Sequence, residues 1–244
     1  AFEKSSLSDV ALAGGGTVSD LEVLTVGASD VDAFAGVNGP ATNPGAMGLS
    51  LEDVNFALVL GKVKAPSDGT AATDLRSFTA VKASVGSASF IGIDGLTLAV
   101  TSLSVDINKG GGTNNGAANT TPLDFSSDSL DVNTGGGNYL SIDYAAETLK
   151  AEGSVDIGVF GFFYVSGNFA FEKSSLSDVA LAGGGTVSDL EVLTVGASDV
   201  DAFAGVNGPA SNPGAMGLSL EDVGFALVLG KVKAPSDGTA ATDL

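Results

Sequence analysis

The chain has 244 residues and a formal net charge of −19, from 29 acidic and 10 basic residues. It contains no histidine, cysteine or tryptophan, which excludes a histidine-based catalytic triad, a thiol nucleophile, the ordinary zinc and copper sites and a disulfide framework. A pI near 4.1 argues against a nucleic-acid partner, whose phosphates the chain would repel, and a mean hydropathy of +0.33 is too high for a disordered chain.

Alternating apolar and polar residues predict β-strands through most of the chain. One pattern recurs: an apolar pair, a short polar corner and a second apolar series. We expect the small polar residues of the corner to satisfy backbone groups where the chain changes direction. In chain order the pattern spans residues 24–33, 49–60, 81–90 and 96–107.

Loops rich in Gly, Pro, Asn, Ser and Thr separate these units, at residues 36–48, 61–73, 108–122 and 133–138. Residues 155–171 alternate for 17 residues, which would span roughly 55 Å if fully extended. We therefore expect a bend or hairpin near Phe160-Gly161. Helix is expected to be minor, with residues 143–150 as its only modest candidate. No apolar run approaches the roughly 18 residues of a membrane-spanning helix, so no transmembrane segment is expected.

The chain contains a long internal repeat. Residues 1–75 recur as residues 170–244, with Thr42 replaced by Ser211 and Asn55 by Gly224. The first copy begins, and the second stops, in the middle of a strand-like run. We therefore expect about one and a half periods of a longer array, with residues 1–169 as one full period and residues 170–244 as the start of the next.

Strand groups separated by turn-rich loops favour an elongated β-solenoid or a continuous stack of β-sheets built from tandem repeats. A chain of discrete β-sandwich domains is the alternative. No Pro- or Ser-rich linker separates the periods, which favours the continuous form. Whether the strands run parallel or antiparallel stays open at this point.

Calcium is the most specific binding hypothesis. Residues 106–111 begin like the D-x-N-x-x-G of some calcium loops, although the acidic fifth position and the final Glu are missing. Acidic pairs elsewhere could supply further oxygen ligands. The candidate ligands are Asp30, Asp32, Glu52, Asp53, Asp106 and Asn108. The alternatives are a strand end followed by a glycine loop, and a solvated acidic surface.

Other motifs carry less chemistry. The glycine triplets at 14–16, 110–112 and 135–137 lack the Lys-Ser/Thr of a P-loop and are expected to be turns. The carboxylate pair of a glycoside hydrolase could form in space, but few aromatic residues are present to stack on sugars, and we expect no enzymatic activity. Asn119 begins the one N-x-S/T sequon. Phe160, Phe162 and Phe163 suggest core packing between sheets, or alternatively a lipid groove.

The long, nearly identical period and the absence of His, Cys and Trp resemble the tandem β-strand repeats of giant bacterial extracellular and cell-surface proteins, adhesin-like or matrix-like. Residues 155–163 and 169–174 carry this resemblance most clearly. It implies display outside the cell, roles in adhesion, matrix or filaments, and often rigidity that depends on calcium. The G-G-x-G-x-D nonapeptide of the RTX calcium roll is absent, so no ligand residue is carried over.

These observations predict a structural segment of a giant secreted protein that forms an extracellular fibre, stalk or filament. Its partners would be neighbouring repeats of the same chain and, by lateral self-association, other chains. One alternative is a calcium-stiffened adhesin repeat that binds a surface, a glycan or divalent cations. Another is a β protein with a hydrophobic lipid-binding groove.

Overall fold

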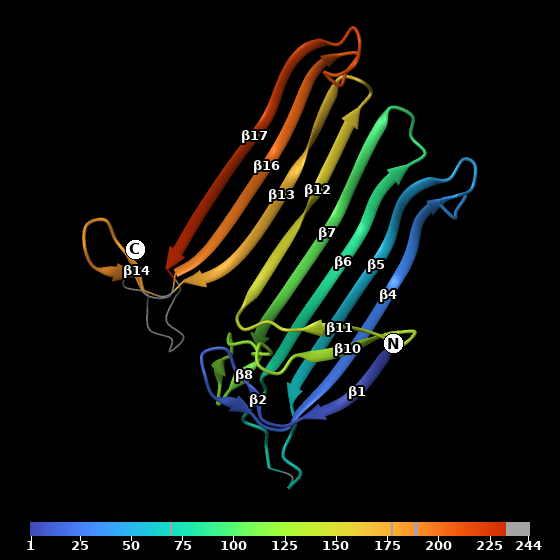
Figure 1. Cartoon of the computed structure of the whole chain (residues 1–244). Helices are drawn as coiled ribbons and strands as arrows, with labels where there is room; N and C mark the ends of the chain where they lie inside the picture. Colours follow the sequence, from blue (N-terminus) through green and yellow to red (C-terminus); the bar gives the residue numbers. More distant parts are fainter. Residues whose placement is uncertain (69, 177, 188–189, 233–244) are drawn as a thin grey trace.

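The computed structural model describes residues 1–68, 70–176, 178–187 and 190–232, and these residues form an all-β fold without a helix. Nine strands make one antiparallel sheet (Figure 1). In order across the sheet they are β1 (Phe2–Leu7), β4 (Leu21–Val37), β5 (Met47–Val63), β6 (Ser77–Ile91), β7 (Leu96–Gly111), β12 (Thr148–Val159), β13 (Phe163–Leu176), β16 (Leu190–Val206) and β17 (Met216–Val232).

Four short hairpins lie outside this sheet. They are β2–β3 (Val10–Ala11 and Thr17–Val18), β8–β9 (Thr113–Asn114 and Ala117–Ala118), β10–β11 (Leu130–Gly135 and Asn138–Ile142) and β14–β15 (Val179–Ala180 and Thr186–Val187). The β10–β11 hairpin crosses the sheet strands rather than extending them (Figure 1). It packs on β4, β5 and β6.

The fold confirms the all-β prediction and decides the strand direction, because every neighbouring pair in the sheet is antiparallel. The described residues show neither solenoid coils nor two facing sheets. The sheet strands instead follow one another in chain order, and each pairs antiparallel with the sheet strand before it, as in successive hairpins. The predicted turn near Phe160-Gly161 is confirmed, since these two residues connect β12 to β13 with φ values of 48° and 73°.

The helix predicted at residues 143–150 is wrong. Residues 143–147 are irregular, and β12 begins at Thr148 in register with Asn108 of β7. Tyr144 is held against the sheet by its hydroxyl, which lies 3.0 Å from the carbonyl oxygen of Val81. Tertiary pairing therefore overrides the modest helix propensity of this segment.

The two copies of the repeat fold in the same register. Phe2 pairs with Val26 and Phe171 with Val195, at positions 169 residues apart. The β4–β5 and β16–β17 ladders also correspond pair by pair. The boundary between the periods, after Phe169, lies inside β13, so the sheet is continuous across it.

The predicted polar corners are not corners. At Asp30, Asp53 and Ser102 they are β-bulges within strands that continue past them, because a residue with positive φ is inserted without ending the ladder. At Gly86 the ladders of β6 continue without a shift in register. Asp30, Asp53, Ser102, Asp199 and Asp222 have φ values of 52° to 55°. With glycines on β6, β12 and β13, they form a bulge row across the sheet: Asp30, Asp53, Gly86, Ser102, Gly153, Gly167, Asp199 and Asp222.

The bulges keep one face of the sheet apolar along the whole strand length. On this face β4 presents Leu24, Val26 and Ala28, at even positions, before Asp30, and the odd positions from Val31 to Val37 after it. Leu21 and Val23 lie on the opposite face, in the buried cluster. In β5 the covered positions likewise change from even to odd across Asp53. An inserted residue reverses which face the even and odd positions point to. The apolar positions in the sequence change from even to odd or from odd to even at the same point, so the apolar side chains stay on one face. We call the face with Leu24 and Leu58 the back face, and the opposite face the front face.

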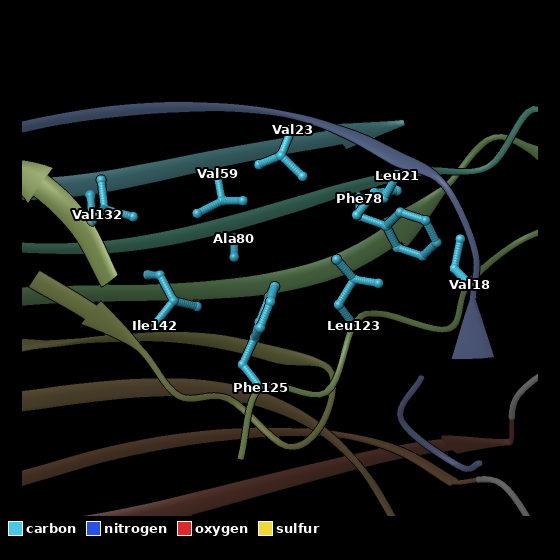
Figure 2. Close-up of a cluster of buried hydrophobic side chains, with 11 residues drawn as sticks. Val18, Leu21, Val23, Val59, Phe78, Ala80, Leu123, Phe125, Val132 and Ile142 are labelled. Carbon is cyan, nitrogen blue, oxygen red and sulfur yellow. The ribbon is translucent and has the colours of Figure 1, made fainter. Parts of the chain in front are cut away.

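The core lies on the front face of the first copy (Figure 2). Here residues 121–146, which we call the covering segment, lie over β4, β5 and β6. The buried apolar cluster contains Val18, Leu21, Val23, Ala57, Val59, Phe78, Ala80, Leu123, Phe125, Val132 and Ile142.

Candidate functional site

The covering segment is attached to the sheet by apolar contacts that leave almost no exposed surface. Leu123, Phe125, Val132 and Ile142 expose 3% or less of their area. At about 25 cal/mol per Å² of buried apolar surface, side chains of this size each stabilise the attachment by roughly 1.5–3 kcal/mol. The segment is therefore an integral layer of the first copy.

Polar anchors fix the register of this segment. The Asn108 side-chain amide donates hydrogen bonds to the carbonyl oxygens of Leu123 (2.8 Å) and Ala146 (2.9 Å), and Asn108 is 1% exposed. The Lys82 ammonium group donates to the Ser141 carbonyl at 3.2 Å and pairs with Asp143 at 2.9 Å. Both side chains rise from the front face. Asn108 binds near both ends of the covering segment, and Lys82 binds near its C-terminal end.

Tyr144 supplies a third anchor. Its hydroxyl lies 2.6 Å from the Asp106 carboxylate and 3.0 Å from the Val81 carbonyl oxygen. Burial, followed by the hydrogen bond to Asp106, raises the pKa of this phenol well above its ordinary value. The tyrosine therefore stays protonated and keeps its hydrogen bond at any physiological pH.

Two of the predicted calcium ligands thus have another role. Residues 106–111, where the sequence predicts a calcium loop, do not form a loop, because they are the last six residues of strand β7. Asp106 accepts the Tyr144 hydrogen bond, and Asn108 holds two backbone carbonyls. Sequence reasoning missed this role, although an asparagine at a core-facing position of an apolar strand is a signal for it.

The other four candidate ligands meet at the bulge row on β4 and β5. The Asp53 backbone N–H donates to the Asp32 carboxylate at 3.2 Å, and the Ser87 hydroxyl donates to Glu52 at 3.2 Å. The Asp30 backbone N–H donates to the side-chain oxygen of Asn55 at 3.1 Å. Within the described ranges, no three Asp or Glu side chains come close enough to hold a metal ion. The Asp32 carboxylate thus satisfies a backbone N–H at the bulge, whereas the Glu52 carboxylate accepts a side-chain hydroxyl.

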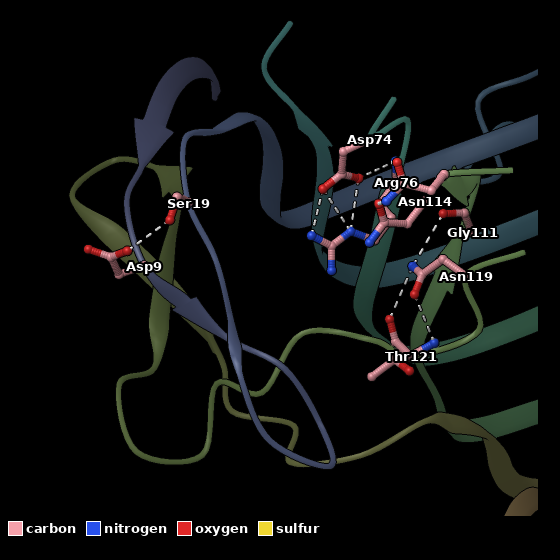
Figure 3. Close-up of polar contacts among 9 residues, drawn as sticks. Asp9, Ser19, Asp74, Arg76, Gly111, Asn114, Asn119 and Thr121 are labelled. Carbon is pink, nitrogen blue, oxygen red and sulfur yellow. Dashed lines mark hydrogen bonds and ion pairs between the residues drawn. The ribbon is translucent and has the colours of Figure 1, made fainter. Parts of the chain in front are cut away.

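The sequon Asn119 lies beside the end of β7 (Figure 3). Its side-chain amide donates to the carbonyl oxygens of Gly111 and Thr121, both at 3.3 Å, and its oxygen accepts the Thr121 N–H at 3.2 Å. The amide nitrogen that a glycan would occupy is therefore engaged in the fold.

An ion pair between Arg76 and Asp74 lies next to this loop (Figure 3). Arg76 donates from Nε to Asp74 at 2.9 Å and from its terminal nitrogen at 2.6 Å, in the fork geometry of a bidentate pair. The hydrogen bonds from Arg76 lower the pKa of the Asp74 carboxyl below its ordinary value.

The glycine triplets at 14–16 and 135–137 are turns, as predicted, and all six residues have positive φ. The third triplet is only partly a turn, because Gly110 and Gly111 still belong to β7. The prediction that the phenylalanine cluster packs in a core is wrong. Phe160 and Phe162 are 58% and 59% exposed, because they lie in the turn at the end of the sheet.

The back face is an extended apolar surface of the described sheet. It includes Val37, Met47, Leu49, Leu60, Phe171, Leu218, Phe225 and Leu227, each more than a third exposed. One shallow groove on it is lined by Phe2, Leu24 and Leu60. At one end, Glu22 lies 3.5 Å from Lys62 and 3.9 Å from Lys4, so its carboxylate offsets one of the two positive charges. Soluble monomers rarely leave an apolar patch of this extent uncovered.

Comparison with protein-family models, with curated protein sequences and with solved structures finds no match to this chain. Nor does the described part of the chain contain a helix able to cross a membrane. Function must therefore be argued from the sheet itself.

Proposed function

We propose that the chain is a structural segment of a secreted tandem-repeat protein, in which each 169-residue period lengthens a single sheet by six strands. The observation that supports this is the position of β13. Its residues Phe171–Leu176 repeat the sequence of β1 and pair with β16 along their whole length. Phe171, Glu172 and Lys173 also pair with β12 on the other side. The repeated sequence thus serves as a strand that joins one period to the next.

The mechanical properties follow from the pairing. Adjacent strands share ladders of 11 to 14 residue pairs across the period boundary, so separating two periods requires many backbone hydrogen bonds to break together. Stability then grows with the number of copies, as in other one-dimensional repeat arrays. The net charge of −19 keeps such an array soluble. A fibre, stalk or filament outside the cell is the role that these properties suit.

The test is the growth of the particle with copy number. Chains of one, two and three periods should lengthen across the strands by a constant increment of about 29 Å per period, for six strands at about 4.8 Å each. Small-angle X-ray scattering measures this increment. Ala170→Pro, which removes a ladder hydrogen bond at the joining strand, is the control and should abolish the regular increment. Separate globules on flexible linkers, or a constant largest dimension, would overturn the proposal.

The back face favours a second role, in lateral association or lipid binding. Nine strands at about 4.8 Å and about 14 residues per strand give a surface on the order of 2,000 Å², more than one side of a standard interface. Two sheets packed back to back would bury it. Lipid that co-purifies with the chain, detected by mass spectrometry, would instead support a lipid-binding protein.

A calcium-stiffened adhesin repeat draws support from the four acidic residues gathered on β4 and β5. It predicts that a chelator lowers the melting temperature by several degrees and that added Ca²⁺ restores it. An unchanged melting temperature would argue against the calcium-stiffened repeat and favour the purely structural role.

A further inference from the structure

Identical residues are covered in the first copy and exposed in the second. Val59 is 1% exposed, whereas its counterpart Val228 is 62% exposed. Ala57 is fully buried, but Ala226 is exposed. Both pairs lie on the front face, at corresponding positions of β5 and β17. Because the residues compared are identical, the difference comes from their surroundings: β5 lies between β4 and β6 and under the covering segment, whereas β17 is the last strand of the described sheet and has no such segment over it.

A pair of glycines shows which neighbour matters. A Cβ atom at Gly27 of β4 would lie 2.5 Å from the backbone oxygen of Asn133 and 3.0 Å from a methyl of Val132. The hairpin backbone therefore rests directly on this glycine. At the counterpart Gly196 of β16, the nearest atom to such a Cβ is the Phe225 oxygen at 3.9 Å. The second copy has the same glycine position, which we call the seat, but no hairpin atom lies above it.

The β2–β3 hairpin and its counterpart β14–β15 show the same difference between the two copies. In the first copy Leu12 forms an isolated β-bridge with Leu123, and the Ala13 N–H donates to the Pro122 carbonyl oxygen at 3.1 Å. Leu181, the counterpart of Leu12, is 52% exposed. The front face of the second copy is covered near the start of β16, where Val192 is only 5% exposed. The open part is thus the strip that the covering segment occupies in the first copy.

We propose that the front face of β16 and β17 is a docking site for a second copy of the covering segment, a β-hairpin with the sequence of residues 121–146. In an array the following period would supply it. This inference rests on the proposed function for the source of the hairpin, but the site itself belongs to the chain described here. Docking would place a copy of Val132 over Gly196 and Ala226, and would cover Val228.

The absence of cysteine makes a thiol a clean reporter. We would introduce Val228→Cys and, separately, Val59→Cys, and measure the rates of maleimide labelling. The thiol at position 228 should react readily and the one at position 59 slowly. A second hairpin of residues 121–146, tethered after Leu244 by a Gly/Ser linker, reaches a local concentration in the millimolar range and should slow labelling at position 228 about tenfold.

The matched variants separate docking from general stabilisation. Gly196→Val fills the seat without a clash in the chain alone, and it should restore fast labelling at position 228 in the tethered protein. Val195→Ile adds bulk to the opposite face of the same strand and should leave the protection intact. Labelling at position 228 that is unaffected by the tethered hairpin, or protection that survives Gly196→Val, would overturn the docking site.

A second measurement guards against an interfering linker. The free 121–146 peptide, titrated into isotopically labelled protein, should shift the amide resonances of Thr194, Gly196 and Ala226, and Gly196→Val should abolish these shifts. Shifts confined to other residues would also refute the inference. Failure of docking leaves the constant increment per period untouched, so it is distinguishable from failure of the proposed function.

Discussion

Replacing Asn108 with alanine is the most informative single test of the first copy. Asn108 is 1% exposed, and its amide is the donor to the Leu123 and Ala146 carbonyl oxygens. Alanine would leave two buried acceptors unsatisfied, each costing roughly 1–3 kcal/mol. We therefore expect Asn108→Ala to lower the free energy of unfolding by about 2–4 kcal/mol, mainly by loosening the covering segment.

Urea denaturation followed by far-UV circular dichroism measures this loss. With an m-value of about 2–3 kcal/mol/M, the midpoint should fall by about 1–2 M. Asn138→Ala, at an exposed position of the β10–β11 hairpin in the covering segment, should change the free energy of unfolding by no more than about 0.5 kcal/mol. Asn108→Asp removes both donors and adds a buried charge, so it should destabilise at least as much. If Asn108→Ala matches the control, or if Asn108→Asp becomes more stable than wild type when Ca²⁺ is added, our assignment of Asn108 as an anchor is wrong.

Three further changes test the packing, the bulges and the anchors. Gly27→Val should destabilise the chain by about 1–3 kcal/mol through overpacking against Asn133, while the same change at Gly196 should be nearly neutral in urea; equal effects would refute the close contact. At Asp53, with φ of 55°, valine should cost about 1–2 kcal/mol and glycine should be tolerated, and equal melting temperatures for the two variants would contradict the bulge. Burial raises the pKa of Tyr144, so its contribution to stability is complete below the unfolded pKa of about 10 and is lost as pH rises above that value. Tyr144→Phe should reduce this alkaline loss of stability by about 1 kcal/mol per pH unit. If the urea midpoints of the wild type and of Tyr144→Phe fall in parallel between about pH 9.5 and 11, the prediction is contradicted.

Sequence reasoning succeeded where a single residue pair decides the local structure. The turn at Phe160-Gly161 was predictable, because a 17-residue alternation is long for one strand and glycine accepts positive φ. The same argument would have divided β4 and β5, yet each runs for 17 residues. Their polar interruptions are bulges, and only the partner strand shows whether an inserted residue bends the chain or is absorbed in the ladder.

The front face could not be predicted in the same way. Asn108 and Leu123 are in contact because residues 121–146 fold back over strands that precede them by up to 100 residues in the sequence. Local periodicity carries no information about such a contact. Asp106 and Asn108 therefore suggested a metal loop from their spacing, although the atoms that they bind belong to the distant segment.

The bulge row has a consequence for the shape of a long assembly. A bulge bends its strand and increases the local twist, and here the bulges of β4, β5, β7, β16 and β17 lie in one row across the sheet. Bends that line up make a crease, and a crease inherited by every period would run unbroken along the array. In the proposed array, a sheet bent along such a line would curve instead of remaining flat, with the apolar back face on one side and the carboxylates of Asp30, Asp53, Asp199 and Asp222 along the bend.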